Sequence, residues 1–142
     1  MPDDDYTVPI GKARIFKEGE DVTIIGWGAM LHEALAAAER LKAEGVSAEV
    51  IDVRAFVPFD HDTIIESVEK TGRVVIVHEA VRTAGFGAEI IAQINEKALT
   101  ALEAPVVRVT GFDTAMPAFR AEHLYLPNAD RIRQAVHKVL QG

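Results

Sequence analysis

The residues most able to bind a ligand or take part in a reaction follow short runs of β-branched residues. They are Gly26-Trp27-Gly28, Asp52 with Arg54, His78-Glu79-Ala80-Val81-Arg82, and Gly111-Phe112-Asp113. If these runs are parallel strands of an open sheet, their carboxyl ends meet at one edge, where such sheets usually bind ligands. We therefore expect these residues to form one polar rim.

Gly26-Trp27-Gly28 could be a phosphate-binding turn, because glycines let backbone N–H groups approach an anion. The dinucleotide-binding pattern G-x-G-x-x-G is incomplete, however, since Leu31 occupies its sixth position. In the interpretation that we favour, the glycines allow a tight turn and Trp27 packs at an interface. No residue is therefore predicted to bind a cofactor.

His78 belongs to the one residue type that titrates near neutral pH, so proton transfer is conceivable. Glu79 follows it on an extended segment, which points the two side chains to opposite sides. They are not expected to act as an acid/base pair, and no nucleophile stands nearby. A histidine at a strand end is more often a structural hydrogen-bonding residue, so no catalytic residue is predicted.

Arg82 begins a second possible anion site. Residues 82–87 contain Gly85 and Gly87 and precede a helical pattern. Backbone N–H groups at a helix start can hold an anion, with Arg82 assisting. The favoured alternative is that the glycines let the backbone approach a neighbouring surface while Thr83 completes a turn or cap.

Asp60-His61-Asp62 has the residue types of a metal site. Consecutive side chains at a helix start rarely converge on one ion. Asp60 as the N-cap, with Asp62 favoured by the helix dipole, explains the segment without a metal. No metal ligand is predicted.

The elements that position these residues repeat one pattern, in which a short apolar run precedes a stretch with helical spacing. We expect strands at 22–25, 48–53, 73–77 and 106–109, helices at 29–44, 61–71, 87–100 and 130–140, and an edge strand at 12–16. Short apolar strands that alternate with helices indicate an α/β fold with a parallel sheet covered on both faces. Residues 1–9 are predicted to be a linker, and residues 10–142 one domain.

Length, composition and charge argue against a nucleic-acid-binding or membrane-spanning protein. The chain has 142 residues, no cysteine and a net charge of -7. This charge would repel nucleic-acid phosphates, and no apolar run approaches the ~20 residues needed to span a bilayer. The acidic N-terminus does not resemble a signal peptide. We therefore expect a cytoplasmic protein without a nucleic-acid or membrane partner.

Several segments together resemble the transketolase C-terminal domain of 2-oxoacid dehydrogenase beta subunits. The resemblance covers about residues 6–140. Its segments are Val8-Pro9-Ile10-Gly11-Lys12-Ala13, Glu18 to Met30, Glu49-Val50-Ile51-Asp52-Val53-Arg54, Pro58-Phe59-Asp60, Thr71-Gly72-Arg73, Val77-His78-Glu79-Ala80, Gly85 to Ile90, Glu103-Ala104-Pro105-Val106, Asp113-Thr114 and Tyr125-Leu126-Pro127-Asn128.

The resemblance implies a three-layer α/β/α fold with a mixed five-stranded sheet, in which four strands are parallel and one edge strand is antiparallel. It implies that the full enzyme decarboxylates pyruvate or a branched-chain 2-oxoacid with thiamine diphosphate and magnesium, then passes the acyl group to a lipoyl arm. The cofactor lies on other domains, so none is expected here. A full beta subunit is more than twice this long, and an isolated domain is expected to be inactive.

The same resemblance implies a role in assembly. Expected partners are an alpha subunit, a second beta subunit and the basic peripheral-subunit-binding domain of the acyltransferase core. Glu103 and the carboxylate of Gly142 match docking positions, and an acidic chain suits a basic partner. The candidate interface residues are Trp27, His78, Glu79, Arg82, Phe86, Glu103 and Gly142, with Phe56 and Phe59 as further apolar surface that favours a homodimer of the isolated chain. The alternative function is an autonomous flavodoxin-like protein that binds a nucleotide or small molecule.

Overall fold

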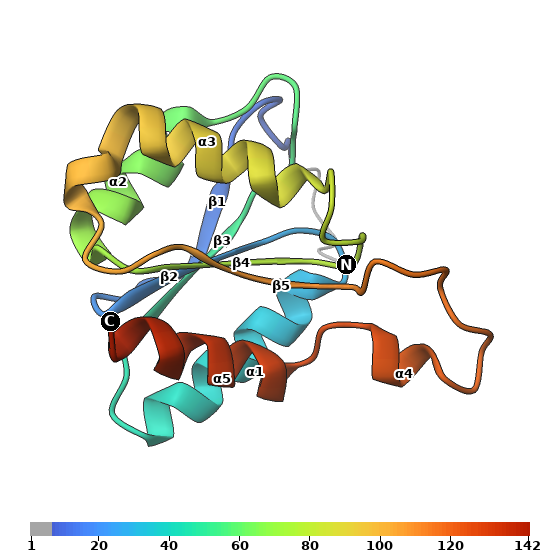
Figure 1. Ribbon diagram of the computed structural model, residues 1–142. Helices are drawn as coiled ribbons and strands as arrows, with labels where there is room; N and C mark the ends of the chain where they lie inside the picture. Colours follow the sequence, from blue (N-terminus) through green and yellow to red (C-terminus); the bar gives the residue numbers. More distant parts are fainter. Residues whose placement is uncertain (1–6) are drawn as a thin grey trace.

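A computed structural model describes residues 7–142, so most of the predicted linker lies outside the described residues. Five strands form one mixed sheet in the order β1-β3-β2-β4-β5 (Figure 1). They are β1 (Arg14–Lys17), β2 (Val22–Gly26), β3 (Ala48–Asp52), β4 (Val74–His78) and β5 (Val107–Thr110). β1 pairs antiparallel with β3, and the other neighbouring strands are parallel. The predicted sheet is confirmed.

Helices cover both faces of the sheet, so the three-layer architecture is also confirmed. One face carries α1 (Met30–Ala43) and α5 (Ala129–Leu140), and the other carries α2 (His61–Thr71) and α3 (Phe86–Ala98) (Figure 1). Side chains along a strand alternate between faces. Ile24 therefore packs in the layer of α1 and α5, while its neighbour Ile25 packs in the layer of α2 and α3. β2 and β4 are buried along their whole length, which explains their continuous apolar sequence.

Several elements begin or end one or two residues from their predicted bounds, and two larger differences occur. The helix predicted over 87–100 ends at Ala98 and continues as a 3-10 turn, η1 (Leu99–Ala101), which leaves Leu99 60% exposed. A short helix, α4 (Glu122–Tyr125), was not predicted. Its four residues are too few to show a helical period.

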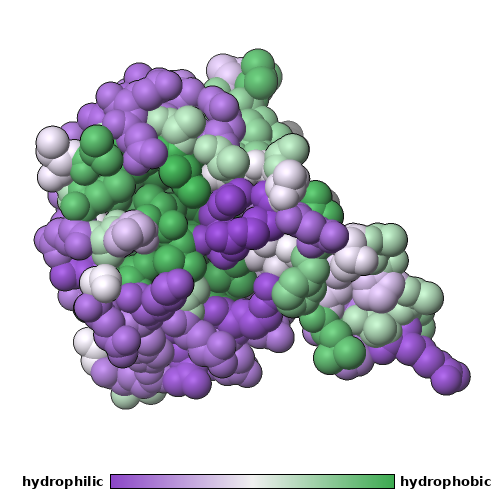
Figure 2. Space-filling view, viewed as in Figure 1, coloured by the Kyte–Doolittle hydropathy of each residue, from purple (hydrophilic) through white to green (hydrophobic). Residues whose placement is uncertain are grey.

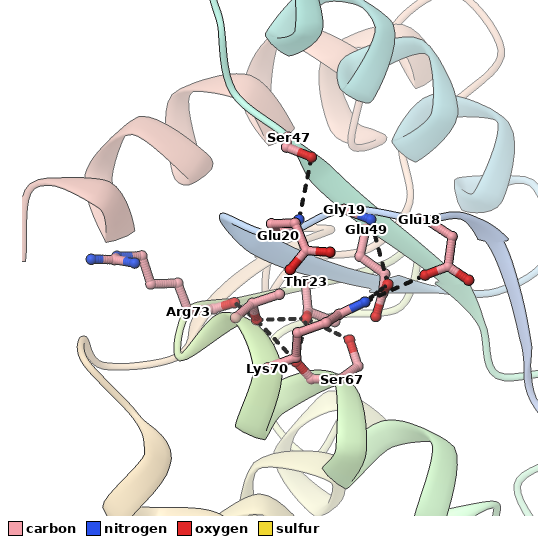
Figure 3. Close-up of polar contacts among 10 residues, drawn as sticks. Glu18, Gly19, Glu20, Thr23, Ser47, Glu49, Ser67, Lys70 and Arg73 are labelled. Carbon is pink, nitrogen blue, oxygen red and sulfur yellow. Dashed lines mark hydrogen bonds and ion pairs between the residues drawn. The ribbon is translucent and has the colours of Figure 1, made fainter.

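A polar cluster lies at the opposite end of the sheet from the predicted rim (Figure 3). Glu49, the second residue of β3, is fully buried and pairs with Lys70 of α2, which also reaches Glu18 at 3.3 Å. Burial alone would raise the pKa of Glu49, but hydrogen bonding to the Lys70 ammonium overrides it and lowers that pKa.

Next to this pair, the Thr23 hydroxyl lies 2.6 Å from the Ser67 hydroxyl and 2.8 Å from the Thr71 hydroxyl. Thr23 belongs to β2 and the other two residues belong to α2, so the cluster fixes the helix on the sheet. Among residues 7–142, none of the helices is both long enough and apolar enough to cross a membrane.

Candidate functional site

The carboxyl ends of β2 and β4 form the topological switch point of the sheet. The chain leaves β2 toward β3 on one side, whereas β4 lies on the other side. Open α/β sheets usually bind ligands in the crevice at such a point. Here Trp27, directly after β2, stacks on His78, the last residue of β4, with ring centroids 5.4 Å apart and planes at 12°. The crevice is therefore filled by the protein's own side chains.

His78 is enclosed on its other sides by backbone. A Cβ atom added at Gly85 would lie 2.6 Å from His78 Cε1, and one added at Gly87 would lie 2.8 Å from His78 Nε2. Contacts this close require glycine, which confirms that these two glycines let the backbone approach a neighbouring surface.

The imidazole of His78 is 0% exposed, and neither ring nitrogen has a hydrogen-bond partner within residues 7–142. His78 therefore acts mainly as a packing group. Burial lowers its pKa, the backbone of Ala80 opposes this in part, and the charges of Arg108 and Arg82 lower the pKa further. The ring is therefore held in its neutral form.

Aromatic rings extend from this stack to the surface. Phe56 meets Trp27 edge-on at 5.2 Å and stacks on Phe86 at 4.2 Å. Phe59 lies 6.0 Å from Phe86. These phenylalanines line a pocket of about 390 Å³ together with Val57, Pro58, His61, Glu89, Ile90 and Gln93. Most of the side chains that line this pocket are apolar, and none of them belongs to the predicted polar rim.

Further large apolar side chains are exposed on the loops at this end. We call them the carboxyl-edge surface, and they are Phe56, Val57, Phe112, Met116, Phe119 and Leu124. Val57 is 91% exposed and Phe119 is 90% exposed. Figure 2 shows hydrophobic atoms on the loop between β3 and α2 and around α4, which projects from the body of the domain in Figure 1. Large exposed apolar patches are typical of surfaces that bind another protein, a membrane or a ligand.

Phe112 was expected in the polar rim, whereas Val57, Met116, Phe119 and Leu124 were not predicted. The last three lie in residues 111–126, which carry no helical or strand period. The sequence nevertheless carries one signal, since this segment contains large apolar residues although Pro117 marks it as a loop. Side chains on a surface loop are not buried in the core, so they remain exposed.

The other candidate residues lie along the free edge of β5, a region we call the β5-edge surface. Glu103 is exposed, pairs with Arg73 at 2.5 Å, and lines a hollow of about 500 Å³ with Ile91, Leu99, Leu102 and Ala104-Pro105-Val106. Arg82 and Gly142 line the adjacent hollow of about 430 Å³ with Arg108 and Lys138. Figure 2 shows apolar surface between α3 and α5. Glu103, Arg82 and Gly142 therefore line one surface along β5 and do not belong to the aromatic cluster of Trp27, His78 and Phe86.

Glu79 is exposed at the end of β4 while His78 is buried, so the two side chains point apart as expected.

The two rejected ligand sites have structural explanations. The Thr83 backbone N–H and hydroxyl donate to the carboxylate of Asp113 at 2.8 and 2.7 Å, so the chain supplies its own anion to the loop before α3. Asp60 is the N-cap of α2, as predicted, and accepts from the Thr63 backbone N–H.

Comparison with known proteins gives consistent results. The family described as "Transketolase, C-terminal domain" matches residues 11–132. The chain is 48% identical over 99% of its length to "Pyruvate dehydrogenase E1 component subunit beta" of Bacillus subtilis, and 51% identical over 95% to the protein of that name from Staphylococcus epidermidis. It covers 43% and 42% of these relatives. A solved structure titled "Split gene transketolase, inactive beta4 tetramer" matches 96% of the chain with a TM-score of 0.84 and 34% identity, and the chain covers 44% of it.

Proposed function

Because the chain belongs to the transketolase C-terminal domain family, we propose that it is the C-terminal domain of a 2-oxoacid dehydrogenase beta subunit and that it serves assembly, not catalysis. Residues 10–142 form the domain and residues 1–9 a linker. The similar curated proteins are named pyruvate dehydrogenase subunits, so pyruvate is the favoured substrate of the whole enzyme over a branched-chain 2-oxoacid. The proposed location is the cytoplasm.

One observation carries this proposal. The crevice where α/β sheets usually bind ligands is filled by Trp27 on His78, and exposed apolar side chains surround it. A surface of this kind can bury apolar area against another domain. It disfavours the alternative of an autonomous flavodoxin-like protein with a nucleotide at Gly26-Trp27-Gly28.

Thiamine diphosphate and magnesium would bind to other parts of the assembly. Within residues 7–142, no group of three histidine, cysteine, aspartate or glutamate side chains could hold a metal ion. No residue of this chain is assigned to bind the cofactor.

A calorimetric titration of the chain with thiamine diphosphate and magnesium tests this assignment. We expect no binding that depends on magnesium. Stoichiometric, magnesium-dependent binding with a micromolar dissociation constant would show that this chain carries the cofactor site and would overturn the assembly role.

The partners proposed for the carboxyl-edge surface are the alpha subunit and a second beta subunit. A hybrid beta subunit tests these two contacts. In the hybrid, the present chain replaces the matching region of the Bacillus subtilis protein, to which it is 48% identical. The hybrid, mixed with the alpha subunit, should form a heterotetramer and decarboxylate pyruvate.

Val57→Asp and Phe119→Asp, at residues 91% and 90% exposed, should block heterotetramer formation while the hybrid still folds. Ala36→Asp, on the exposed face of α1, is the control for an added charge. If all three variants assemble to the same extent as the unmodified hybrid, the carboxyl-edge surface is not the contact.

For the β5-edge surface we propose docking of the basic peripheral-subunit-binding domain, with Glu103 and Gly142 as its contacts. Glu103→Gln removes the charge without setting a second cation beside Arg73, as Glu103→Arg would. Binding of the basic domain to the hybrid heterotetramer, measured by calorimetry, should weaken at least tenfold for either variant. The control is Glu96→Gln on the exposed face of α3. An unchanged affinity for the Glu103 variants would count against this surface.

A further inference from the structure

A groove beside Trp27 concentrates positive charge on a chain whose net charge is -7. It lies toward β1 and β3, whereas the Trp27–His78 stack lies toward β4. The groove has a volume of about 710 Å³ and is lined by Val8, Arg14, Phe16, Trp27, Gly28, Asp52, Arg54 and Phe56. This volume is within the usual range of small-molecule sites, roughly 300–1,000 Å³.

Two guanidinium groups face one aromatic ring in this groove. Arg14 Cζ lies 4.5 Å from the centroid of Phe16, and Arg54 Cζ lies 5.9 Å from the same centroid. A cation over an aromatic face is attracted to the ring, which holds both groups in place. Like charges held near one ring repel each other, so the pair favours an anion between them.

The groove contains one carboxylate for its two guanidinium groups. Asp52 Oδ2 lies 3.6 Å from Arg54 Nε, and Asp52 Oδ1 accepts from the Arg54 backbone N–H at 3.2 Å. Within residues 7–142, Arg14 forms no ion pair. Among the described residues, the lining therefore carries one more cationic than anionic side chain.

The start of α1 adds to this positive potential. Gly28 lines the groove just before the helix, and the N-cap Ala29 makes no side-chain capping bond. Glu33, the acidic residue of the first turn, accepts from the Ala129 backbone N–H at 2.8 Å and is committed to α5. The dipole of the helix therefore supports an anion at this end.

We propose that this groove binds a small organic phosphate, with its phosphate held by Arg14 and Arg54 and its apolar part against Phe16 and Phe56. Guanidinium groups bind phosphate oxygens through paired N–H donors. The site shares Phe56 with the carboxyl-edge surface, but its proposed phosphate contacts, Arg14 and Arg54, belong to neither the carboxyl-edge surface nor the β5-edge surface.

Trp27 is the only tryptophan of the chain and lines the groove, so its fluorescence reports on ligands. The probes are inorganic phosphate and pyrophosphate, titrated against sodium chloride at equal ionic strength and repeated by calorimetry. We expect saturable binding of both phosphates and none of chloride. Arg14→Gln and Arg54→Gln should each raise the dissociation constant at least tenfold.

Arg40→Gln is the matched control, since Arg40 is exposed and pairs with Asp130 at 2.7 Å far from the groove. Arg14 is also exposed, so its variant should fold, and circular dichroism checks this. The proposal fails if chloride reproduces the phosphate signal or if the Arg14 and Arg54 variants bind phosphate as well as the Arg40 variant does. It also fails if a polyglutamate peptide binds and phosphate does not, which would identify an acidic protein partner.

Discussion

His78 is a buried ionisable residue whose protonation the fold opposes. Its imidazole has no hydrogen-bond partner within the described residues and packs between Trp27 and the backbone of Gly85 and Gly87. Burial lowers its pKa relative to the unfolded chain, with help from the charges of Arg108 and Arg82. The consequence appears in the pH dependence of stability.

Above pH about 6.5, the ordinary histidine pKa, the ring is neutral in both states and contributes no pH dependence. Below this value the unfolded chain takes up a proton that the folded chain resists. Stability should therefore fall as the pH falls from about 6.5 toward the lowered pKa, by at most about 1.4 kcal/mol per pH unit.

Urea denaturation of the unmodified chain and of His78→Gln, between pH 7.5 and 5.5, checks this prediction. The variant should lose less stability across the range. The control is His123→Gln, at an exposed histidine. Equal slopes for the unmodified chain and the His78 variant would show that this residue does not resist protonation.

The Glu49–Lys70 pair is the most buried ion pair of the described residues. The Glu49 side chain is 0% exposed and that of Lys70 is 30% exposed. Lys70→Met would leave the glutamate buried without a counter-charge. Because Lys70 is partly solvated, we expect a loss of about 2–3 kcal/mol, less than the roughly 3–5 kcal/mol typical of a fully buried pair.

Lys17→Met is the matched control, since Lys17 pairs at 2.6 Å with Glu39, whose side chain is 68% exposed. This variant should cost less than about 1 kcal/mol. Adding Glu49→Gln to Lys70→Met should recover part of the loss, because the unpaired charge is gone. If urea denaturation gives the same cost for both lysine variants, the burial of Glu49 has no energetic consequence.

At the scale of the elements, Asp60 connects α2 to the segment before β1. Its carboxylate accepts from the Thr63 hydroxyl at 2.8 Å and from the Ala13 backbone N–H at 3.0 Å. Asp60→Ala would remove the N-cap and leave the Ala13 N–H without its acceptor. We expect a cost of about 2–3 kcal/mol in the free energy of unfolding.

Asp60→Asn keeps an acceptor oxygen and should cost less than half as much. Asp62→Ala, at an exposed residue in the same first turn, should cost less than about 1 kcal/mol. Urea denaturation of the three variants provides the comparison. A loss for Asp60→Ala no larger than that for Asp62→Ala would mean that the link to Ala13 contributes nothing.

The regular elements were predictable because their signals are local. Gly72 ends α2 with a φ of 65°, and the expected bounds of that helix, 61–71, are the observed ones. The β-branched runs of β2 and β4 indicated strands buried on both faces. Residues 99–101 were less predictable, since Leu99 continues the apolar pattern of α3 but the helix ends before it.

The site was predictable only in part, for a physical reason. The strand ends fixed which residues meet at the carboxyl edge, so the proximity of Trp27 and His78 follows from the topology. Whether two such side chains leave a cavity or stack on each other depends on packing, which the sequence pattern does not contain. The bond from Thr83 to Asp113 is of the same kind, because it joins loops 30 residues apart.

At the scale of the whole molecule, the carboxyl-edge surface should make the isolated chain self-associate. Phe119 and Leu124 are 90% and 68% exposed on the projecting segment around α4. Burying such side chains removes apolar area from water at roughly 25 cal/mol per Å². We therefore expect sedimentation equilibrium to show a dimer that dissociates on dilution.

Phe119→Ser together with Leu124→Ser should raise the dimer dissociation constant at least tenfold, because the contact loses its apolar side chains. Leu99→Ser is the matched control, since Leu99 is 60% exposed but lies on the β5-edge surface. If Leu99→Ser alone dissociates the dimer, the β5-edge surface is the contact between copies, and the projecting segment then remains available to the other domains of the assembly. If the unmodified chain is a monomer at every concentration, the exposed apolar area is too divided to hold two copies together.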